Sequence, residues 1–371
     1  MSGVSKVSHG GDIWEASERY GFPISRILDF SANINFLGPS PRVVETLRDV
    51  LSDIVHYPDP DARPFQREVA RYMGVDEEHV LPGNGATEII HLLGRLPGLR
   101  CALIPSPTFS EYGFAMERAG VEVRRLALRE RDGFTPRARE IMHNLGGVDV
   151  LFLCNPNNPT GRLIDEVELD ELVEFCEHKG IRIVLDESFI DFVPDGRRRS
   201  FAPRVGSYKE LVVVFSLTKF FAIPGIRLGC GLGRQELIHF LKGKKPPWSV
   251  NSLAQVAGIA ALRDREYILA SKRAVALERA FLYGRLRSIP KLKVYPSSAN
   301  FLLMKLLARE WDSRRLARVL ARKGILVRDC SNFEFLGRRF IRVAVRSRKE
   351  NLRLLQELER LVALGGFGHG V

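Results

Sequence analysis

The sequence predicts an α/β protein in two parts, a larger three-layer domain with a mostly parallel sheet and a smaller α+β domain. Short apolar runs alternate along the chain with amphipathic segments, a pattern typical of parallel strands that helices cover on both faces. The length of 371 residues suggests one large or two medium domains. Apolar residues make up 45% of the chain and charged residues 27%, as in an ordinary globular protein.

The larger domain is expected over residues 45–265, with residues 1–44 as an N-terminal arm that joins the smaller domain. An amphipathic segment, 166–179, separates two of the apolar runs and ends before Gly180, a residue type favoured just after a helix. We expect buried strands at four apolar runs, namely 102–104, 148–153, 181–185 and 211–215.

The smaller domain is expected over residues 266–371, where the spacing of apolar residues changes. Its glycine-rich end, 365–371, is expected to fray. The patterns predict helices at 267–287, 313–323 and 349–364, and strands at 300–305, 325–328 and 340–345.

The composition also argues against several classes of protein. The five cysteines are scattered and form no CxxC pair, which favours reduced thiols over a disulfide framework or a zinc site, so no metal is expected. No run approaches the roughly 20 apolar residues of a membrane span, and the start lacks the apolar region of a secretory signal, so we expect a cytoplasmic protein. The net charge of +12 is spread along the chain, which favours an anionic small molecule over nucleic acid.

A glycine-rich turn at 82–88 follows the apolar pair 80–81 and opens an apolar helix at 89–93. Such a turn presents free N–H groups and the positive end of a helix, which together bind phosphate. The turn matches neither of the common nucleotide-binding glycine patterns, so a nucleotide is not expected. A helix cap without a ligand remains the alternative.

Three further loops follow apolar runs. An asparagine-rich loop occupies 154–161, Asp186 ends the run at 183–185, and Lys219 follows the run at 213–215. Phe220 and Phe221 beside Lys219 reduce its hydration, which lowers the pKa of an amine and makes it a usable nucleophile. Taken singly, the lysine could be a surface residue and the aspartate a helix cap. Together with the phosphate turn, the loops suit a phosphorylated aromatic cofactor held as a Schiff base, with an acid on its ring nitrogen.

On these residues the chain resembles the fold-type I pyridoxal-phosphate enzymes of the aspartate aminotransferase superfamily, over nearly its whole length. The resemblance implies pyridoxal 5'-phosphate bound to Lys219, with Asp186 on the ring nitrogen, Asn158 on the phenolic oxygen and Phe109 stacked on the ring. The phosphate contacts that it implies come from Gly85, Ala86, Thr87, Ser216, Thr218 and Arg227.

Two further features bear on this resemblance. Tyr57 resembles the tyrosine that reaches the phosphate in the neighbouring subunit, which implies a homodimer with shared active sites. Phe189 stands where many relatives carry a tyrosine that donates to the phenolic oxygen, and this weakens the case for a generic aminotransferase.

Two arginines near the C-terminus fit an anionic substrate. Arg328 and Arg342 fall at expected strand positions, and two guanidinium groups could hold a substrate that bears a carboxylate and a phosphate. Two exposed strand arginines are the alternative. Histidinol-phosphate aminotransferases share this pair, so the pair does not decide the reaction.

The segments 8–13, 28–35 and 186–192 resemble those of the L-threonine O-3-phosphate decarboxylases. That resemblance implies substrate contacts from His9, Gly10 and Asn33, beside Asn158 and the two arginines. It also implies decarboxylation of O-phospho-L-threonine to (R)-1-aminopropan-2-ol O-phosphate, for the nucleotide-loop linker of cobalamin. A histidinol-phosphate aminotransferase, or a related aminotransferase with a phosphorylated substrate, is the alternative. A basic nucleic-acid-binding protein with a vestigial enzyme fold also remains open.

Overall fold

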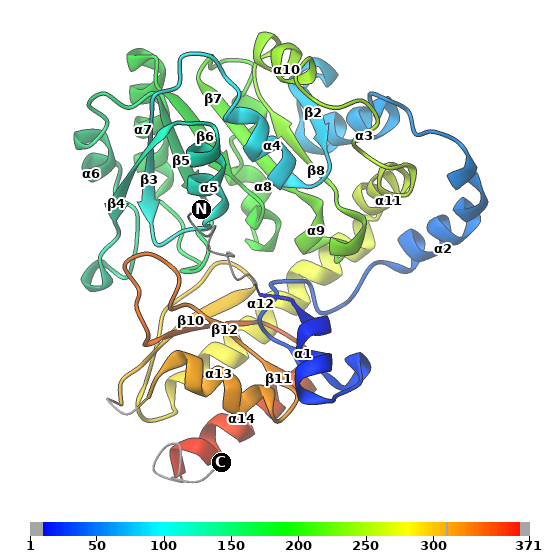
Figure 1. Cartoon of the computed structure of the whole chain (residues 1–371). Coiled ribbons are helices and arrows are strands. Elements are labelled where there is room, and N and C mark those ends of the chain that lie inside the picture. Colours follow the sequence, from blue (N-terminus) through cyan, green and yellow to red (C-terminus); the bar gives the residue numbers. More distant parts are fainter. Residues whose placement is uncertain (1–9, 309–310, 364–371) are drawn as a thin grey trace, which may run out of the picture.

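The computed structural model describes residues 10–308 and 311–363, and it shows a large domain built on a twisted sheet above a smaller domain (Figure 1). The expected α/β class, with a large mostly parallel sheet and a smaller α+β part, is confirmed. The end at 365–371, which was expected to fray, lies outside the described residues.

The large sheet has seven strands, and every neighbouring pair is parallel except the two pairs that contain β8. The four predicted apolar runs form β3, β5, β6 and β7, which lie in the middle of the sheet. In spatial order the strands are β2 (Val80–Gly83), β8 (Gly229–Leu232), β7 (Leu211–Ser216), β6 (Arg182–Asp186), β5 (Val150–Cys154), β3 (Cys101–Ser106) and β4 (Glu122–Ala127).

The antiparallel strand β8 brings a helix close to the sheet. A Cβ added at Gly229 would lie 2.5 Å from the backbone nitrogen of Ala86, and one added at Gly231 would lie 2.7 Å from the side chain of Ile89. Both contacted residues belong to helix α4 (Ala86–Leu93). Because only glycine leaves this space, the phosphate turn at the start of α4 can pack directly on the sheet.

Alternate residues of each central strand pack on opposite faces of the sheet, which makes three layers. In β7, Leu211, Val213 and Phe215 face one core, whereas Val212 and Val214 face the other. The first face is covered by α3 (Arg63–Met73), α6 (Ala138–His143), α7 (Glu166–Lys179) and α11 (Ser252–Arg263), and the second by α4, α5 (Glu111–Arg118) and α10 (Gln235–Lys242). Two short helices, α8 (Gly196–Arg199) and α9 (Leu217–Phe220), follow β6 and β7.

The small domain carries an antiparallel sheet in the order β12-β13-β10-β9. The predicted strand at 325–328 is wrong in one respect, because Val327 belongs to no strand and the segment forms two separate strands. β11 (Ile325–Leu326) pairs in parallel with β1 (Leu28–Asp29), whereas β12 (Arg328–Asp329) pairs with β13. The remaining elements are β9 (Leu292–Val294), β10 (Phe301–Leu306), β13 (Phe340–Ala344), α1 (Ile13–Tyr20), α13 (Ser313–Ala321) and α14 (Arg348–Ala363).

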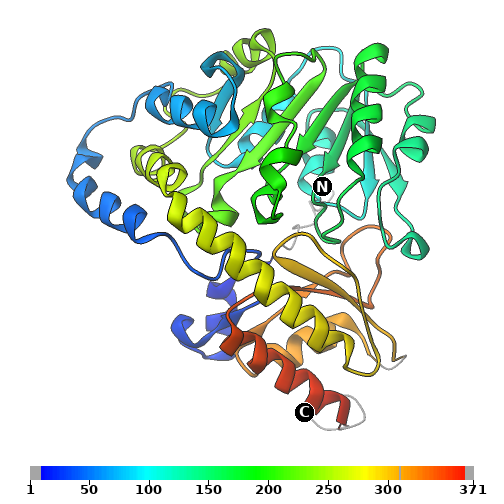
Figure 2. The same cartoon turned by 180° about the vertical axis from the view of Figure 1, so that it is seen from behind.

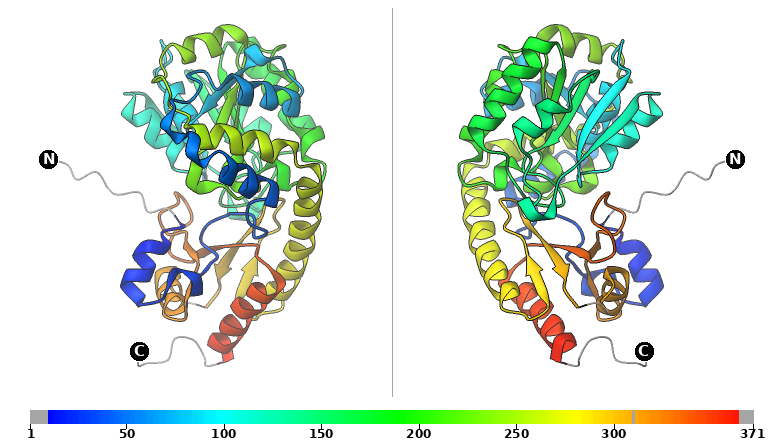
Figure 3. Two further views of the ribbon diagram at one scale, coloured as in Figure 1. Left: turned by 90° about the vertical axis from the view of Figure 1, so that its right-hand side faces the viewer. Right: turned by 90° about the vertical axis from the view of Figure 1, so that its left-hand side faces the viewer.

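The long helix α12 (Arg265–Arg287) runs from the large domain along the small one, as Figures 2 and 3 show from behind and from the side. The chain crosses in the opposite direction after β1, and α2 (Pro41–Asp49) packs on α11 of the large domain. The domain boundaries at 44/45 and 265/266 remain predictions. Among the described helices, none has the length and apolar character that a membrane span requires.

Candidate active site

A cavity of about 380 Å³ lies where the carboxyl ends of β5, β6 and β7 meet the small domain. Most of the predicted site residues line it, and they come from segments far apart in the sequence. They are Gly10, Asn33, Ala86, Thr87, Phe109, Asn158, Asp186, Ser216, Thr218, Lys219, Arg227, Arg328 and Arg342.

Three predicted residues do not line this cavity. Gly85 lies directly beside it as the N-cap of α4. Tyr57 is 82% exposed on the surface and packs against Trp248, with 5.0 Å between the ring centroids. His9 lies outside the described residues.

One corner of the cavity is rich in hydrogen-bond donors. Gly85 has a φ of 79°, and a Cβ built on it would lie 2.7 Å from Nη2 of Arg227. The glycine therefore lets the guanidinium of Arg227 approach the start of α4, where backbone N–H groups are free of helical partners. The hydroxyls of Ser216 and Thr218 lie 2.8 Å apart on the same side. Such a set of donors matches a phosphate group.

Lys219 lies on α9, a single helical turn that Ser216 caps at the end of β7. The backbone of this turn is held from outside, since the Asn35 N–H donates to the Lys219 carbonyl at 3.0 Å and the Asn35 side chain donates to the Phe220 carbonyl at 2.9 Å. The pKa of Lys219 is lowered from 10.5 to about 8. Burial contributes most to this change, the charges of Arg227 and Arg342 add to it, and the charge of Asp186 opposes it. A substantial share of the amine is therefore unprotonated at mildly alkaline pH.

Asp186 ends β6 deep in the cavity. Its Oδ2 accepts a hydrogen bond from the Tyr112 hydroxyl at 2.6 Å, and its Oδ1 accepts one from the Ser188 N–H at 2.8 Å. Burial raises the pKa of Asp186, while the bonds from Ser188 and Tyr112 act in the opposite direction. The two donors fix the orientation of the carboxylate and favour its charged form.

Sequence reasoning missed Tyr112. It stacks on Phe152 with ring centroids 5.4 Å apart, and it meets Phe109 edge to face at 5.6 Å. It lies in the first turn of helix α5, just after the predicted stacking residue Phe109, and no local pattern singles it out. Its partner, Asp186, is distant in the sequence, so the pair could not be read from local pattern.

Arg342 lies in β13 with 5% of its surface exposed. Its Nη2 donates to the Ser31 carbonyl at 2.7 Å, and its Nη1 donates to Oδ1 of Asn158. The guanidinium also lies 5.3 Å from the ring centre of Phe301. Burial lowers the pKa of Arg342 to about 10, so the group remains charged at neutral pH.

Arg328 stands directly opposite Arg342 in the β12–β13 ladder and is 8% exposed. Its Nη2 donates to Oδ1 of Asn332 at 2.8 Å, and its guanidinium lies 5.1 Å from the ring centre of Phe333. Burial lowers the pKa of Arg328 as well. The alternative of two exposed strand arginines is therefore wrong, and the cavity contains two buried cations in addition to the Lys219 amine.

The N-terminal segment forms the remaining wall. Asn33 is buried, and its Oδ1 has no hydrogen-bond partner among the described residues. A Cβ added at Gly10 would lie 2.3 Å from the Ser31 carbonyl oxygen, so only glycine fits there. Phe189 also lines the cavity and packs edge to face on Phe301 at 5.1 Å, so no hydroxyl is present at this position.

This fold and this arrangement of side chains define a known class. Residues 25–358 match the family described as aminotransferase class I and II, and the chain belongs to that family. Among its relatives is the threonine-phosphate decarboxylase of Salmonella typhimurium, which is 39% identical over 356 residues that cover 96% of each chain.

Solved structures give the same result. The L-threonine-O-3-phosphate decarboxylase of Porphyromonas gingivalis superposes with a TM-score of 0.79 at 26% identity, covering 91% of this chain and 100% of the other. The histidinol-phosphate aminotransferase of Clostridium acetobutylicum superposes with a TM-score of 0.85 at 31% identity, again with 91% and 100% coverage. The predicted family resemblance is confirmed, and both candidate reactions occur among its relatives.

Proposed function

We propose that this protein is a pyridoxal-phosphate-dependent decarboxylase of O-phospho-L-threonine, which releases carbon dioxide and (R)-1-aminopropan-2-ol O-phosphate. Arg328 and Arg342, on paired strands, are buried in the same cavity as the Lys219 amine and support an anionic, phosphorylated substrate, while the 39% identity to the Salmonella threonine-phosphate decarboxylase is the observation that carries the choice of reaction. A substrate with a carboxylate at one end and a phosphate at the other matches two such cations. The 39% identity to the Salmonella enzyme supports the same substrate and a role in making the cobalamin linker.

The residues present fit pyridoxal phosphate. Arg227 closes on Gly85 in the space that a Cβ would fill, which leaves a corner of donors suited to the phosphate. Asp186 is fixed by two donors, as a partner of a protonated ring nitrogen must be. In this proposal the phosphate contacts come from Gly85, Ala86, Thr87, Ser216, Thr218 and Arg227, the ring contacts from Phe109, Asn158 and Asp186, and the covalent link from Lys219.

When bound, the cofactor supplies an electron sink for the pair left on Cα after a bond to that carbon breaks. Asp186 keeps a proton at the ring nitrogen, and its own charge is favoured by the Tyr112 and Ser188 donors. Lys219, with its lowered pKa, exchanges a proton near neutral pH and delivers it to Cα after the carboxylate has left as carbon dioxide. One proton therefore replaces one carboxylate on Cα.

In this proposal the substrate-binding residues determine which bond to Cα breaks. We assign the substrate carboxylate to Arg342, beside Asn158, and the phosphate to Arg328, Asn33, Gly10 and His9. Holding the phosphate far from Cα sets the rotation of the Cα substituents, and binding energy at that end favours loss of the carboxylate over loss of the hydrogen. Phe189 adds no competing hydrogen bond in the cavity.

The proposal includes a homodimer. Leu51, Ile54, Val55 and Tyr57 are exposed on the segment that follows α2, and Trp248 lies against Tyr57. An apolar surface of this kind favours contact with a second copy, which would bring Tyr57 to the partner's phosphate corner. A cytoplasmic location is also part of the proposal, since all five cysteines are buried as free thiols.

The test is a paired assay of the enzyme reconstituted with pyridoxal phosphate. O-phospho-L-threonine should release carbon dioxide, and unphosphorylated threonine should react at least a hundredfold more slowly. Arg328→Ala should reduce this preference for the phosphorylated substrate. Rapid glutamate formation from histidinol phosphate and 2-oxoglutarate, without carbon dioxide release from phosphothreonine, would instead establish the aminotransferase that the Clostridium structure represents.

A further inference from the structure

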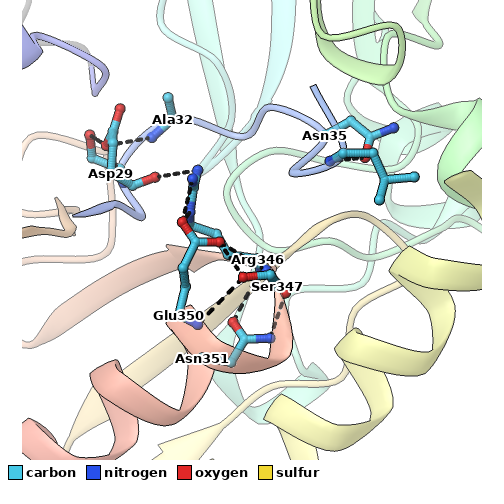
Figure 4. A network of polar contacts seen from close by, with 9 residues as sticks. Asp29, Ala32, Asn35, Arg346, Ser347, Glu350 and Asn351 are labelled. Carbon is cyan, nitrogen blue, oxygen red and sulfur yellow. Dashed lines mark hydrogen bonds and ion pairs between the residues drawn. The ribbon is translucent and has the colours of Figure 1, made fainter. Parts of the chain in front are cut away.

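A tight turn at residues 29–32 separates β1 from the cavity, and it is held from two sides (Figure 4). Oδ1 of Asp29 accepts hydrogen bonds from the Ser31 N–H at 2.8 Å, the Ser31 hydroxyl at 2.6 Å and the Ala32 N–H at 3.3 Å. The Asp29 carbonyl accepts one from Nη1 of Arg346 at 3.1 Å. Arg346 is itself fixed by Glu350, whose Oε1 lies 2.7 Å from Nη2.

Ser31 connects this turn to the cavity. Its carbonyl accepts the 2.7 Å bond from Arg342, while its hydroxyl accepts a bond from the Gly11 N–H at 2.8 Å. Gly10 packs closely against the same carbonyl, since an added Cβ would lie 2.3 Å from the oxygen. The position of one carbonyl group therefore depends on Asp29 and in turn fixes the arginine.

Arg342 depends on this carbonyl for its orientation. Its only other hydrogen-bond acceptor in the described residues is the Asn158 side chain, and its Nε has no partner there. A guanidinium binds a carboxylate well only when its two parallel N–H groups point at the two oxygens. A displaced Ser31 carbonyl would rotate that plane, and misplacement by about 1 Å at a binding group is costly.

We propose that Asp29 is a positioning residue for the substrate carboxylate, because it holds the turn that aims the Ser31 carbonyl at Arg342. This inference rests on the proposed function, in which Arg342 binds the carboxylate. All three bonds of the Asp29 side chain stay within the turn, so Asp29 acts through Ser31 and Arg342.

The experiment uses the enzyme loaded with pyridoxal phosphate and compares a ligand that has the carboxylate with one that lacks it. The KM for O-phospho-L-threonine is measured from carbon dioxide release, and the dissociation constant of (R)-1-aminopropan-2-ol O-phosphate is measured from the cofactor absorbance. Asp29→Ala should raise the KM about tenfold and leave product affinity and cofactor affinity within twofold of wild type. Asp29→Asn keeps the Oδ1 acceptor and should restore the KM to within threefold.

Asp312→Ala is the matched control, because Asp312 makes the same kind of bonds, to the N–H groups of Arg314 at 2.9 Å and Arg315 at 3.3 Å, away from the cavity. It should leave the KM unchanged. Arg346→Met releases the Asp29 carbonyl and should raise the KM about threefold with unchanged product affinity, which covers the case in which Asp29→Ala does not fold.

Three results would overturn the inference alone: an unchanged KM in the Asp29 and Arg346 variants, an equal loss of product affinity, or an equal loss in Asp312→Ala. A wild-type enzyme that binds neither ligand would overturn both the inference and the proposed function.

Discussion

Lys219 should destabilise the cofactor-free protein at neutral pH. Its amine shares a cavity with Arg227 and Arg342, and burial and these two charges lower its pKa from 10.5 to about 8. The folded state therefore binds this proton less tightly than the unfolded state does. Lys219→Met removes the cation and keeps an apolar stem of similar length, so the variant should be more stable than wild type at pH 7.

The pKa values give the size and pH range of the effect. The difference between 10.5 and about 8, at about 1.4 kcal/mol for each pH unit, corresponds to about 3 kcal/mol. Below pH 8 both states hold the proton, so the full penalty applies. Between pH 8 and 10.5 the folded state releases the proton while the unfolded state keeps it, so wild-type stability rises with pH. Above pH 10.5 the penalty is gone.

The assay is urea unfolding of the cofactor-free proteins, followed by circular dichroism at pH 7 and pH 10.5 in a buffer without phosphate. The advantage of Lys219→Met over wild type should be about 3 kcal/mol at pH 7 and should fall to less than about 0.5 kcal/mol at pH 10.5. The exposed Lys323, replaced in the same way, should change the free energy of unfolding by less than about 0.5 kcal/mol at either pH. A Lys219→Met protein no more stable than wild type at pH 7 would refute the reasoning.

Three other substitutions test separate parts of the site. Arg227→Ala removes a charged donor beside Gly85 and should weaken pyridoxal-phosphate binding by about 1.5–3 kcal/mol, measured by equilibrium titration; unchanged affinity would remove Arg227 from the phosphate corner. Tyr112→Phe removes the 2.6 Å donor to Asp186 and further raises the pKa of this carboxyl. The acid limb of the pH–rate profile should therefore move to higher pH. An unmoved limb would contradict the role of Tyr112 in keeping Asp186 charged. Gly10→Ala places a Cβ 2.3 Å from the Ser31 carbonyl and should raise the KM for phosphothreonine at least tenfold, whereas a KM equal to wild type would show that this contact is unimportant.

Residues at the ends of the central strands could be predicted from the sequence. Asp186 directly follows one apolar run and Lys219 lies in the short helical turn after another, and parallel strands bring their carboxyl ends to one edge of the sheet. The glycine-rich turn before α4 could also be predicted, because it follows an apolar run in the same way. For these residues the local sequence pattern is enough to indicate their position in the fold, and the structure places them around one cavity.

Other features depend on contacts between distant segments. The antiparallel strand β8 has only four residues, two of them glycine, so its apolar signal is weak. The pairing of Tyr112 with Asp186 joins residues 74 positions apart, and the bond from Arg342 to Ser31 joins residues 311 positions apart. The split of the predicted strand at 325–328 follows from the pairing of β11 with β1, which no local pattern indicates.

The residues that could be predicted from local pattern and those that depend on long-range contacts lie on opposite sides of the cavity. The side that suits the proposed cofactor is built by strand ends of the large sheet and by the N-terminus of helix α4. The opposite side is built by β12, β13 and the segment that contains Ser31 and Asn33, all outside that sheet. In the proposed function the orientation of the substrate is set on this side, where Arg342 donates to the Ser31 carbonyl. In the proposed function, a change of reaction within this scaffold would arise in the N-terminal turn and in the loop after β6 that contains Phe189, while the strands of the large sheet can remain as they are.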